Sequence, residues 1–154
     1  MSVKTSAGLL MYRIKEGKHE VLLVHPGGPF WKNKDLGTWS IPKGEQDEGE
    51  TDLLEVAKRE FKEETGFEPN PPFVSLGSVK RKDGRPIYAW AFEGDYDPAG
   101  LKSNTIFIDW PPRSGKKMEI PEVDRAAFFS LEEAKQKVSA AQVGLLEEFE
   151  KHVK

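Results

Sequence analysis

Three glutamates lie within five positions of the segment REFKEETGF, residues 59–67, namely Glu60, Glu63 and Glu64. If this segment is a helix, the carboxylates are spaced three and four residues apart and repel one another. On a helical wheel that starts at Leu53, Glu64, Glu60 and Glu63 fall at about +20°, −20° and −80°, beside an apolar arc of about 100°. The carboxylates therefore lie along the edge of the buried face, where uncompensated negative charge is costly.

A divalent cation would turn this repulsion into attraction. Mg²⁺ is a hard ion that binds through a few carboxylates, waters and substrate phosphates. The alternative is a solvated charged face, because Arg59 lies four residues from both Glu55 and Glu63, a spacing that stabilises a helix. A calcium loop of the EF-hand type is excluded, because the segment DEGETDLLE lacks the alternating ligands and the glycine at the sixth position.

The elements that must position these glutamates can be predicted from apolar periodicity and turn residues. A helix is expected from a cap at Thr51 or Asp52 to a terminating Gly66. Two hairpins of strands and a closing strand followed by helices point to an α+β sandwich with a mixed sheet. The predicted strands are residues 5–14, 19–25, 38–42, 73–79, 86–96, 105–110 and 124–129, and the later helices are residues 131–141 and 141–152.

The composition places limits on the class of protein. The chain has 154 residues, 37% hydrophobic and 32% charged, which is typical of a globular protein and fits one domain over residues 1–154. No apolar run reaches the roughly 20 residues that span a bilayer, and the first residues do not resemble a secretory signal, so we expect a cytoplasmic protein without a membrane partner. There is no cysteine, so any metal must use oxygen or imidazole ligands.

With the preceding loop included, the segment GEQDEGETDLLEVAKREFKEETGF, residues 44–67, resembles the signature of the Nudix hydrolases, G-x5-E-x7-R-E-U-x-E-E-x-G-U, in which U is a bulky aliphatic residue. Eight residues separate Glu50 from Arg59 where the family has seven, and Phe61 and Phe67 replace the aliphatics. We expect the extra residue in the turn or in the first turn of the helix. The matching positions are Gly44, Glu50, Arg59, Glu60, Phe61, Glu63, Glu64, Gly66 and Phe67.

The resemblance implies a Nudix fold, a mixed β-sheet between helices, and hydrolysis of a nucleoside diphosphate linked to another group X with Mg²⁺ or Mn²⁺. It further implies that Glu63 and Glu64 are the main metal ligands, that Glu60 is a further ligand or orients a water, and that the Gly44 carbonyl is a possible ligand. Arg59 would hold the glutamates in place.

Many members of the family use a further acid from a loop beyond the signature. By its distance from the last strand, Glu122 is our candidate for this acid, and Glu119 is the alternative. Either carboxylate could instead be solvated.

Substrate-binding candidates come from basic and aromatic residues near the signature. Arg113 and Lys116, in the segment PPRSGKK, could hold a polyphosphate, and Lys43 adjoins the metal loop. Trp31 could stack on a base, or it could instead cover the core. A surface lysine is the default alternative for Lys43.

The entry segment SIPKGE is similar to that of Nudix enzymes that act on dinucleoside polyphosphates, related nucleotides or inositol pyrophosphates. We therefore expect a small-molecule partner, a dinucleoside polyphosphate or an NTP-like nucleotide. Two alternatives stay open: a non-catalytic Nudix module that binds a nucleotide or a protein, and an RNA 5′-end pyrophosphohydrolase. The net charge of −3 argues against a nucleic-acid partner, and the oligomeric state is left open.

Overall fold

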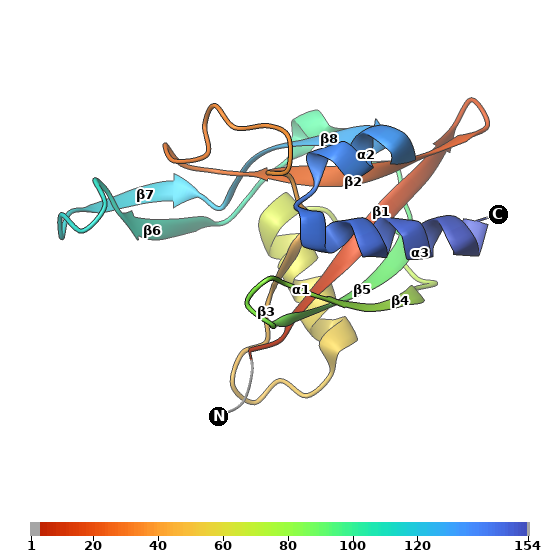
Figure 1. Ribbon diagram of the computed structural model, residues 1–154, viewed down its shortest axis with the longest axis horizontal. Helices are drawn as coiled ribbons and strands as arrows, with labels where there is room; N and C mark the ends of the chain where they lie inside the picture. Colours follow the sequence, from red (N-terminus) through yellow and green to blue (C-terminus); the bar gives the residue numbers. More distant parts are fainter. Residues whose placement is uncertain (1–3, 154) are drawn as a thin grey trace.

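The computed structural model describes residues 4–153, and its centre is a six-stranded mixed sheet (Figure 1). The strand order is β4-β5-β1-β2-β8, and β3 pairs with β1 outside this path. Strands β1 and β5 run parallel, and the other pairs of this sheet are antiparallel. The strands of the central sheet are β1 Ser6–Lys15, β2 Lys18–Pro26, β3 Lys43–Glu45, β4 Val74–Lys80, β5 Pro86–Glu93 and β8 Val123–Ser130.

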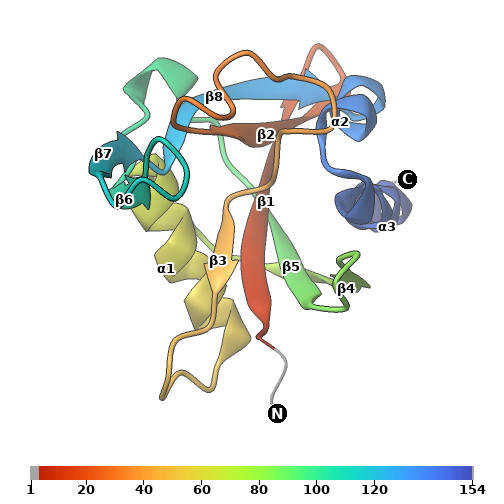
Figure 2. The same ribbon diagram turned by 60° about the vertical axis from the view of Figure 1, so that its left-hand side comes forward.

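Helices cover both faces of the sheet (Figure 2). Helix α1, Leu53–Thr65, packs on one face, and α2, Leu131–Lys137, and α3, Val143–Val153, pack on the other. Because both faces are buried, β1 carries an unbroken apolar run in which Leu9 faces α1 and Leu10 faces the C-terminal helices. The predicted α+β sandwich with a mixed sheet is confirmed.

Helix α1 has the ends that its sequence predicts. The Asp52 side chain accepts hydrogen bonds from the backbone N–H groups of Leu54 and Glu55, so Asp52 rather than Thr51 is the cap. Gly66 ends the helix in the left-handed conformation, with φ of 76°, and donates its N–H to the Lys62 carbonyl. None of the helices within residues 4–153 combines the length and the apolar character needed to cross a membrane.

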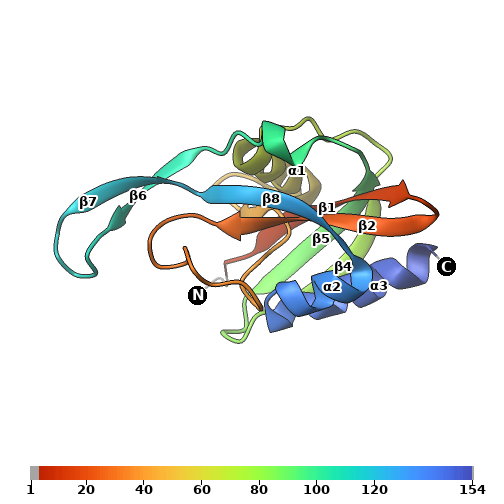
Figure 3. The same cartoon turned by 90° about the horizontal axis from the view of Figure 1, so that it is seen from above.

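A second sheet of two strands projects from the body of the molecule (Figures 1 and 3). It is formed by β6, Thr105–Asp109, and β7, Lys117–Pro121, which pair antiparallel. Residues 104 and 122 join this hairpin to the rest of the fold at its two ends. The short 3₁₀ helices η1, Pro98–Gly100, and η2, Ala140–Gln142, complete the described elements.

Three details differ from the sequence prediction. Residues 38–42 form only isolated bridges, from Trp39 to Val138 and from Ser40 to Val24, and the strand begins at Lys43. Strand β7 lies in residues 117–121, for which no strand was predicted, although Met118 and Ile120 alternate with polar residues there and the segment pairs with β6. The helix predicted over residues 131–141 stops at Lys137, where Val138 adopts an extended conformation and pairs with Trp39.

Candidate functional site

A small hollow lies where β2, β3, α1 and the start of β8 meet. It has a volume of about 190 Å³, and its walls include Val24, Ser40, Lys43, Glu64 and Glu122. Its acids come from segments far apart in the sequence, one from α1 and one from the residue that joins β7 to β8. The hollow therefore exists only in the folded chain.

Three carboxylates gather at this hollow. One oxygen from each of Glu60, Glu64 and Glu122 lies within 4.8 Å of the others. Glu60 is only 7% exposed and Glu64 only 4%, while Glu122 is half-buried. Helical spacing places Glu60 and Glu64 one turn apart on the face of α1 that points into the protein.

The electrostatics of the cluster follow from this burial. Burial raises the pKa of Glu60 to about 7, because it outweighs the opposing effect of Arg59 and is reinforced by Glu63 and Glu122. Burial also raises the pKa of Glu64 well above its usual value, and Glu122 and Glu60 add to the rise. The burial of the site therefore disfavours the ionised form of both glutamates.

Gly44 forms the wall against which Glu60 lies. A Cβ atom at residue 44 would lie 2.1 Å from the Cδ atom of Glu60 and 2.2 Å from its Oε2 atom. The first glycine of the signature is therefore required by sterics, because any side chain would displace the Glu60 carboxylate. The backbone of β3, paired with Ala7 of β1, holds this wall in place.

Arg59 binds the acids that surround the cluster. Its Nε and Nη2 atoms donate to the two oxygens of Glu50, at 3.1 and 2.8 Å. Its Nη1 atom donates to Glu60 at 2.9 Å and to Glu63 at 3.2 Å. Despite the extra residue between Glu50 and Arg59, their side chains meet in a 2.8 Å ion pair.

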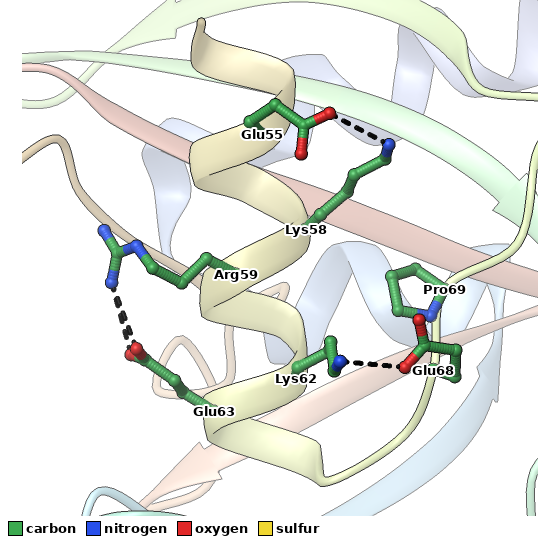
Figure 4. A pocket seen from close by; sticks show the side chains of 7 residues that line it. All are labelled: Glu55, Lys58, Arg59, Lys62, Glu63, Glu68 and Pro69. Atoms are coloured by element: carbon green, nitrogen blue, oxygen red, sulfur yellow. Dashed lines mark hydrogen bonds and ion pairs between the residues drawn. The ribbon is translucent and has the colours of Figure 1, made fainter. Parts of the chain in front are cut away.

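Glu63 is placed apart from the other acids of the signature. Its side chain is 41% exposed and is not among the three carboxylates of the cluster. It lies on the outer side of α1, where it and Arg59 point toward each other beside Lys62 and Glu68 (Figure 4). In this arrangement Glu122, from outside the signature, occupies the position next to Glu60 and Glu64.

Asn104 orients Glu122 and was not found from the sequence. Its Nδ2 atom donates to Oε1 of Glu122 at 3.0 Å, and its backbone carbonyl accepts from the Glu122 N–H at 3.0 Å. Its own N–H donates to the carbonyl of Glu63 at 2.8 Å, which ties it to the end of α1. A lone asparagine in a loop gives no signal in sequence, because its partners Glu122 and Glu63 lie 18 and 41 positions away.

Among the described residues, Lys43 is the one cationic residue that lines the small hollow. Burial lowers the pKa of Lys43, although Glu64 acts in the opposite direction. Its ammonium group faces the same space as Glu64 and Glu122 and can meet an anionic ligand there.

The other predicted substrate contacts are farther out. Trp31 is 38% exposed and lines an apolar cleft beside the β6–β7 hairpin. Arg113 and Lys116 are exposed at the tip of that hairpin and line neither the small hollow nor the apolar cleft. Glu119, the alternative to Glu122, is exposed and accepts a hydrogen bond from Thr105 of the paired strand.

The residues of the cluster fit a hard divalent cation. They are carboxylates, and burial, with a smaller contribution from the neighbouring acids, raises the pKa of Glu60 and of Glu64, an environment in which a bound cation would favour their ionised form. Gly44 lies on β3, directly against Glu60, and its backbone carbonyl is a further candidate ligand.

Comparison with known proteins identifies the family. The NUDIX domain model matches residues 4–149, so the chain belongs to the NUDIX family. No curated protein matches the sequence. The predicted family and Nudix fold are confirmed, as is the prediction of an enzyme that acts on phosphoanhydride bonds.

Solved structures share the fold at low sequence identity. An Ap4A hydrolase from C. elegans, in a binary complex, superposes with a TM-score of 0.68 at 22% identity, covering 97% of this chain and 98% of that one. The NUDIX domain of Shewanella oneidensis NrtR, complexed with ADP ribose, gives a TM-score of 0.70 at 17% identity, covering 100% and 90%. A MutT protein from Methanosarcina mazei Go1 gives 0.63 at 23% identity, covering 98% and 95%.

Proposed function

We propose that this protein is a divalent-metal-dependent pyrophosphohydrolase that cleaves a nucleoside diphosphate linked to a group X. The observation that carries the proposal is the convergence of Glu60, Glu64 and Glu122 within 4.8 Å at a hollow that Lys43 also lines. The leading substrates are dinucleoside polyphosphates and NTP-like nucleotides. This choice follows from the SIPKGE segment that leads into the site.

Glu60, Glu64 and Glu122 would hold Mg²⁺ or Mn²⁺, with the Gly44 carbonyl as a further ligand. When bound, the cation neutralises phosphate charge and lowers the pKa of an attacking water. Glu63 is proposed as an outer member of the site, which reaches the cation only if Arg59 releases it.

The remaining residues position these groups. Arg59 draws Glu50, Glu60 and Glu63 together through its guanidinium. The Lys43 ammonium would contact a phosphate oxygen. Catalysis in such a site is largely a matter of positioning and electrostatics, because phosphoryl transfer needs little covalent participation of the protein.

A substrate panel tests the proposal. Product release would be measured from dinucleoside polyphosphates, NTPs, ADP-ribose and inositol pyrophosphates, each with Mg²⁺, with Mn²⁺ and with chelator. Glu64→Gln is compared with Glu55→Gln, a change on the exposed side of the same helix. We expect metal-dependent hydrolysis of one class, lost in Glu64→Gln and kept in Glu55→Gln.

Absence of turnover by folded protein across the panel would refute the proposal and favour a non-catalytic binding module. Turnover of 5′-triphosphorylated RNA in preference to free nucleotides would instead favour an RNA 5′-end pyrophosphohydrolase. Salt dependence separates these outcomes, because binding to a nucleic-acid backbone weakens steeply with salt.

A further inference from the structure

The β6–β7 hairpin is a separate two-stranded sheet that extends away from the central sheet (Figures 1 and 3). Isolated two-stranded hairpins are only marginally stable in water, whereas sheets of three or more strands with an apolar face are stable. On β6, Phe107 is 68% exposed and Ile106 is 37% exposed. Strand β6 therefore presents apolar side chains at an edge of the kind that pairs with another chain.

The hydrogen bonds at the two ends of the hairpin fix which backbone groups of β6 face β7. The Glu122 N–H donates to the Asn104 carbonyl at one end, and the Trp110 N–H donates to the Lys116 carbonyl at the other. Hydrogen-bonded pairs alternate along an antiparallel ladder. In the register of this hairpin, the even-numbered residues of β6 are therefore the ones that bond to β7.

The odd-numbered residues of β6 have backbone groups that point away from β7. These residues are Thr105, Phe107 and Asp109. Within residues 4–153 no second strand pairs with this edge, and no backbone hydrogen bond joins it to another segment. The outer edge of β6 is thus a row of free donors and acceptors.

This free edge is complementary to itself. If two copies of β6 lie antiparallel with Phe107 opposite Phe107, then Ile106 meets Ile108 and Thr105 meets Asp109 of the other copy. The outward groups of the odd-numbered residues then face one another, which is the phase that hydrogen-bonded pairs require. Asp109 is the one charged residue of β6, and it would face a neutral threonine, so no like charges meet.

The outer edge of β7 lacks this complementarity. Antiparallel pairing of β7 centred on Glu119 would place two glutamates opposite each other, which is destabilising. Pro121 has no N–H, and a Cβ atom at Gly27 would lie 2.0 Å from its carbonyl oxygen, so the loop before Trp31 covers that end. Because the hairpin offers one suitable edge, pairing through it closes at two copies and does not continue into a filament.

The same register brings opposite charges together. In an antiparallel pair, the turn of each hairpin lies beside the start of β6 in the other copy. The turn carries the exposed Arg113 and Lys116. The start of β6 follows Asn104, which binds the carbonyl of Glu63 and the side chain of Glu122. The basic turn of one copy therefore points toward the acidic end of α1 in the other.

We propose that two copies of this chain associate through their β6 strands into a two-fold symmetric dimer, in which Phe107 of one copy contacts Phe107 of the other. The hairpins then form one continuous sheet in the order β7-β6-β6-β7. One strand from each copy is a small contact, so we expect a dimer that dissociates in the micromolar range. The proposal concerns association alone and does not depend on the proposed hydrolysis.

Sedimentation velocity over about a hundredfold range of protein concentration, up to the high micromolar range, tests the dimer. The wild type is compared with Phe107→Lys, with Phe107→Asp and with an equimolar mixture of these two variants. Leu36→Lys is the matched control, because Leu36 is also 68% exposed but lies outside the hairpin. Thermal melting of each variant checks that it folds.

Each charged variant alone should dimerise at least about tenfold more weakly than the wild type, because residue 107 would then face a like charge. The mixture should regain a dimer, since lysine would face aspartate, and Leu36→Lys should dimerise as the wild type does. A wild type that stays monomeric throughout, or a Phe107→Lys variant that dimerises equally well, would overturn the proposal. A mixture that stays monomeric while the wild type dimerises would also reject pairing centred on Phe107.

Disulfide trapping tests the register, since the chain has no cysteine of its own. Ile106→Cys and Ile108→Cys would lie in a pair without backbone hydrogen bonds, where Cα atoms are about 4.5 Å apart and a disulfide can form. We expect the mixed disulfide on mild oxidation of the two variants together, detected by mass spectrometry. Ile106→Cys with Met118→Cys is the control, because Met118 would lie one strand farther away. Equal trapping in both mixtures would contradict the register.

Discussion

The Glu60 carboxylate occupies the space where Gly44 would carry a side chain, with only 2.1 Å between its Cδ atom and the position of a Cβ atom on Gly44. The loop glycine and the helix glutamate are thus a matched pair. The two residues are 16 positions apart in the sequence, and each restricts the side chain that can stand at the other position.

Replacing Gly44 by alanine should disable the site without unfolding the protein. The new methyl group must push the Glu60 carboxylate away from Glu64 and Glu122, and a displacement of about 1 Å can cost about 100-fold in rate. Activity and metal affinity are measured together with the melting temperature. Gly100→Ala is the control, since its Cβ atom would meet Phe67 at an ordinary 3.8 Å. Unchanged activity in Gly44→Ala would contradict the assignment of Glu60 to the site.

The metal-free protein should lose stability as pH rises. The pKa of Glu60 is about 7 in the folded state against 4.5 in the unfolded chain, so the folded state binds more protons between these values. Below about pH 4.5 both states are protonated, and the free energy of unfolding falls from there to about pH 7. Glu64, whose pKa is also raised, extends the loss in the same direction.

Melting temperatures measured in chelator from pH 5 to pH 8 check this prediction. Glu60→Gln should have a flatter pH profile than the wild type, while Glu55→Gln should follow the wild type. Adding Mg²⁺ should stabilise the wild type most at high pH, where the carboxylates are ionised. A melting temperature that rises through this pH range in chelator would contradict the raised pKa values of Glu60 and Glu64.

Asn104 should act as a positioning residue for Glu122. Asn104→Ala removes the hydrogen bond to Oε1 of Glu122 but keeps the backbone bonds of residue 104. Groups that orient metal ligands typically contribute about 10- to 100-fold in affinity or activity. We expect Mg²⁺ affinity to weaken by this order, measured by titration. Asn70→Ala, at an exposed position bonded to Tyr96, should leave it unchanged.

His25 should be a structural anchor for the loop that carries Trp31. The ring is fully buried, with Nε2 at 2.7 Å from the Lys34 carbonyl and Nδ1 at 2.9 Å from Oδ1 of Asp124. Because a carbonyl only accepts, Nε2 donates to it, and Nδ1 faces the carboxylate of Asp124.

His25→Phe removes both bonds and leaves a carbonyl and a carboxylate unpaired, so we expect it to lower the free energy of unfolding by about 2 to 4 kcal/mol. Asp124→Asn should cost much less, because the amide can donate to a neutral ring. Urea denaturation measures both, with the exposed His152→Phe as control. Equal stability of His25→Phe and the wild type would show that the anchor is unimportant.

Local signals explain what the sequence predicted of the fold. Capping at Asp52, the left-handed end at Gly66 and the apolar run of β1 depend on neighbouring residues and can be read directly. The end of α2 at Lys137 depends on pairing with the distant Trp39, so periodicity could not reveal it, whereas strand β7 carries a short alternation of Met118 and Ile120 that was overlooked.

The same distinction holds for the site. Glu60 and Glu64 follow from helical spacing, and Glu122 was inferred from its distance to the last strand. Asn104 carries no local pattern, because it acts on the site only through its hydrogen bond to Glu122. That residues 1–154 form one domain stays a prediction.

The β6–β7 hairpin begins just after Asn104 and ends just before Glu122, so a whole two-stranded arm is inserted between Glu122 of the carboxylate cluster and the residue that orients it. Its strands can vary in length and side chains while the two anchors stay fixed by their mutual hydrogen bonds. Descendants of this chain could therefore change the length and the surface of one arm while the carboxylate cluster at α1 kept its geometry.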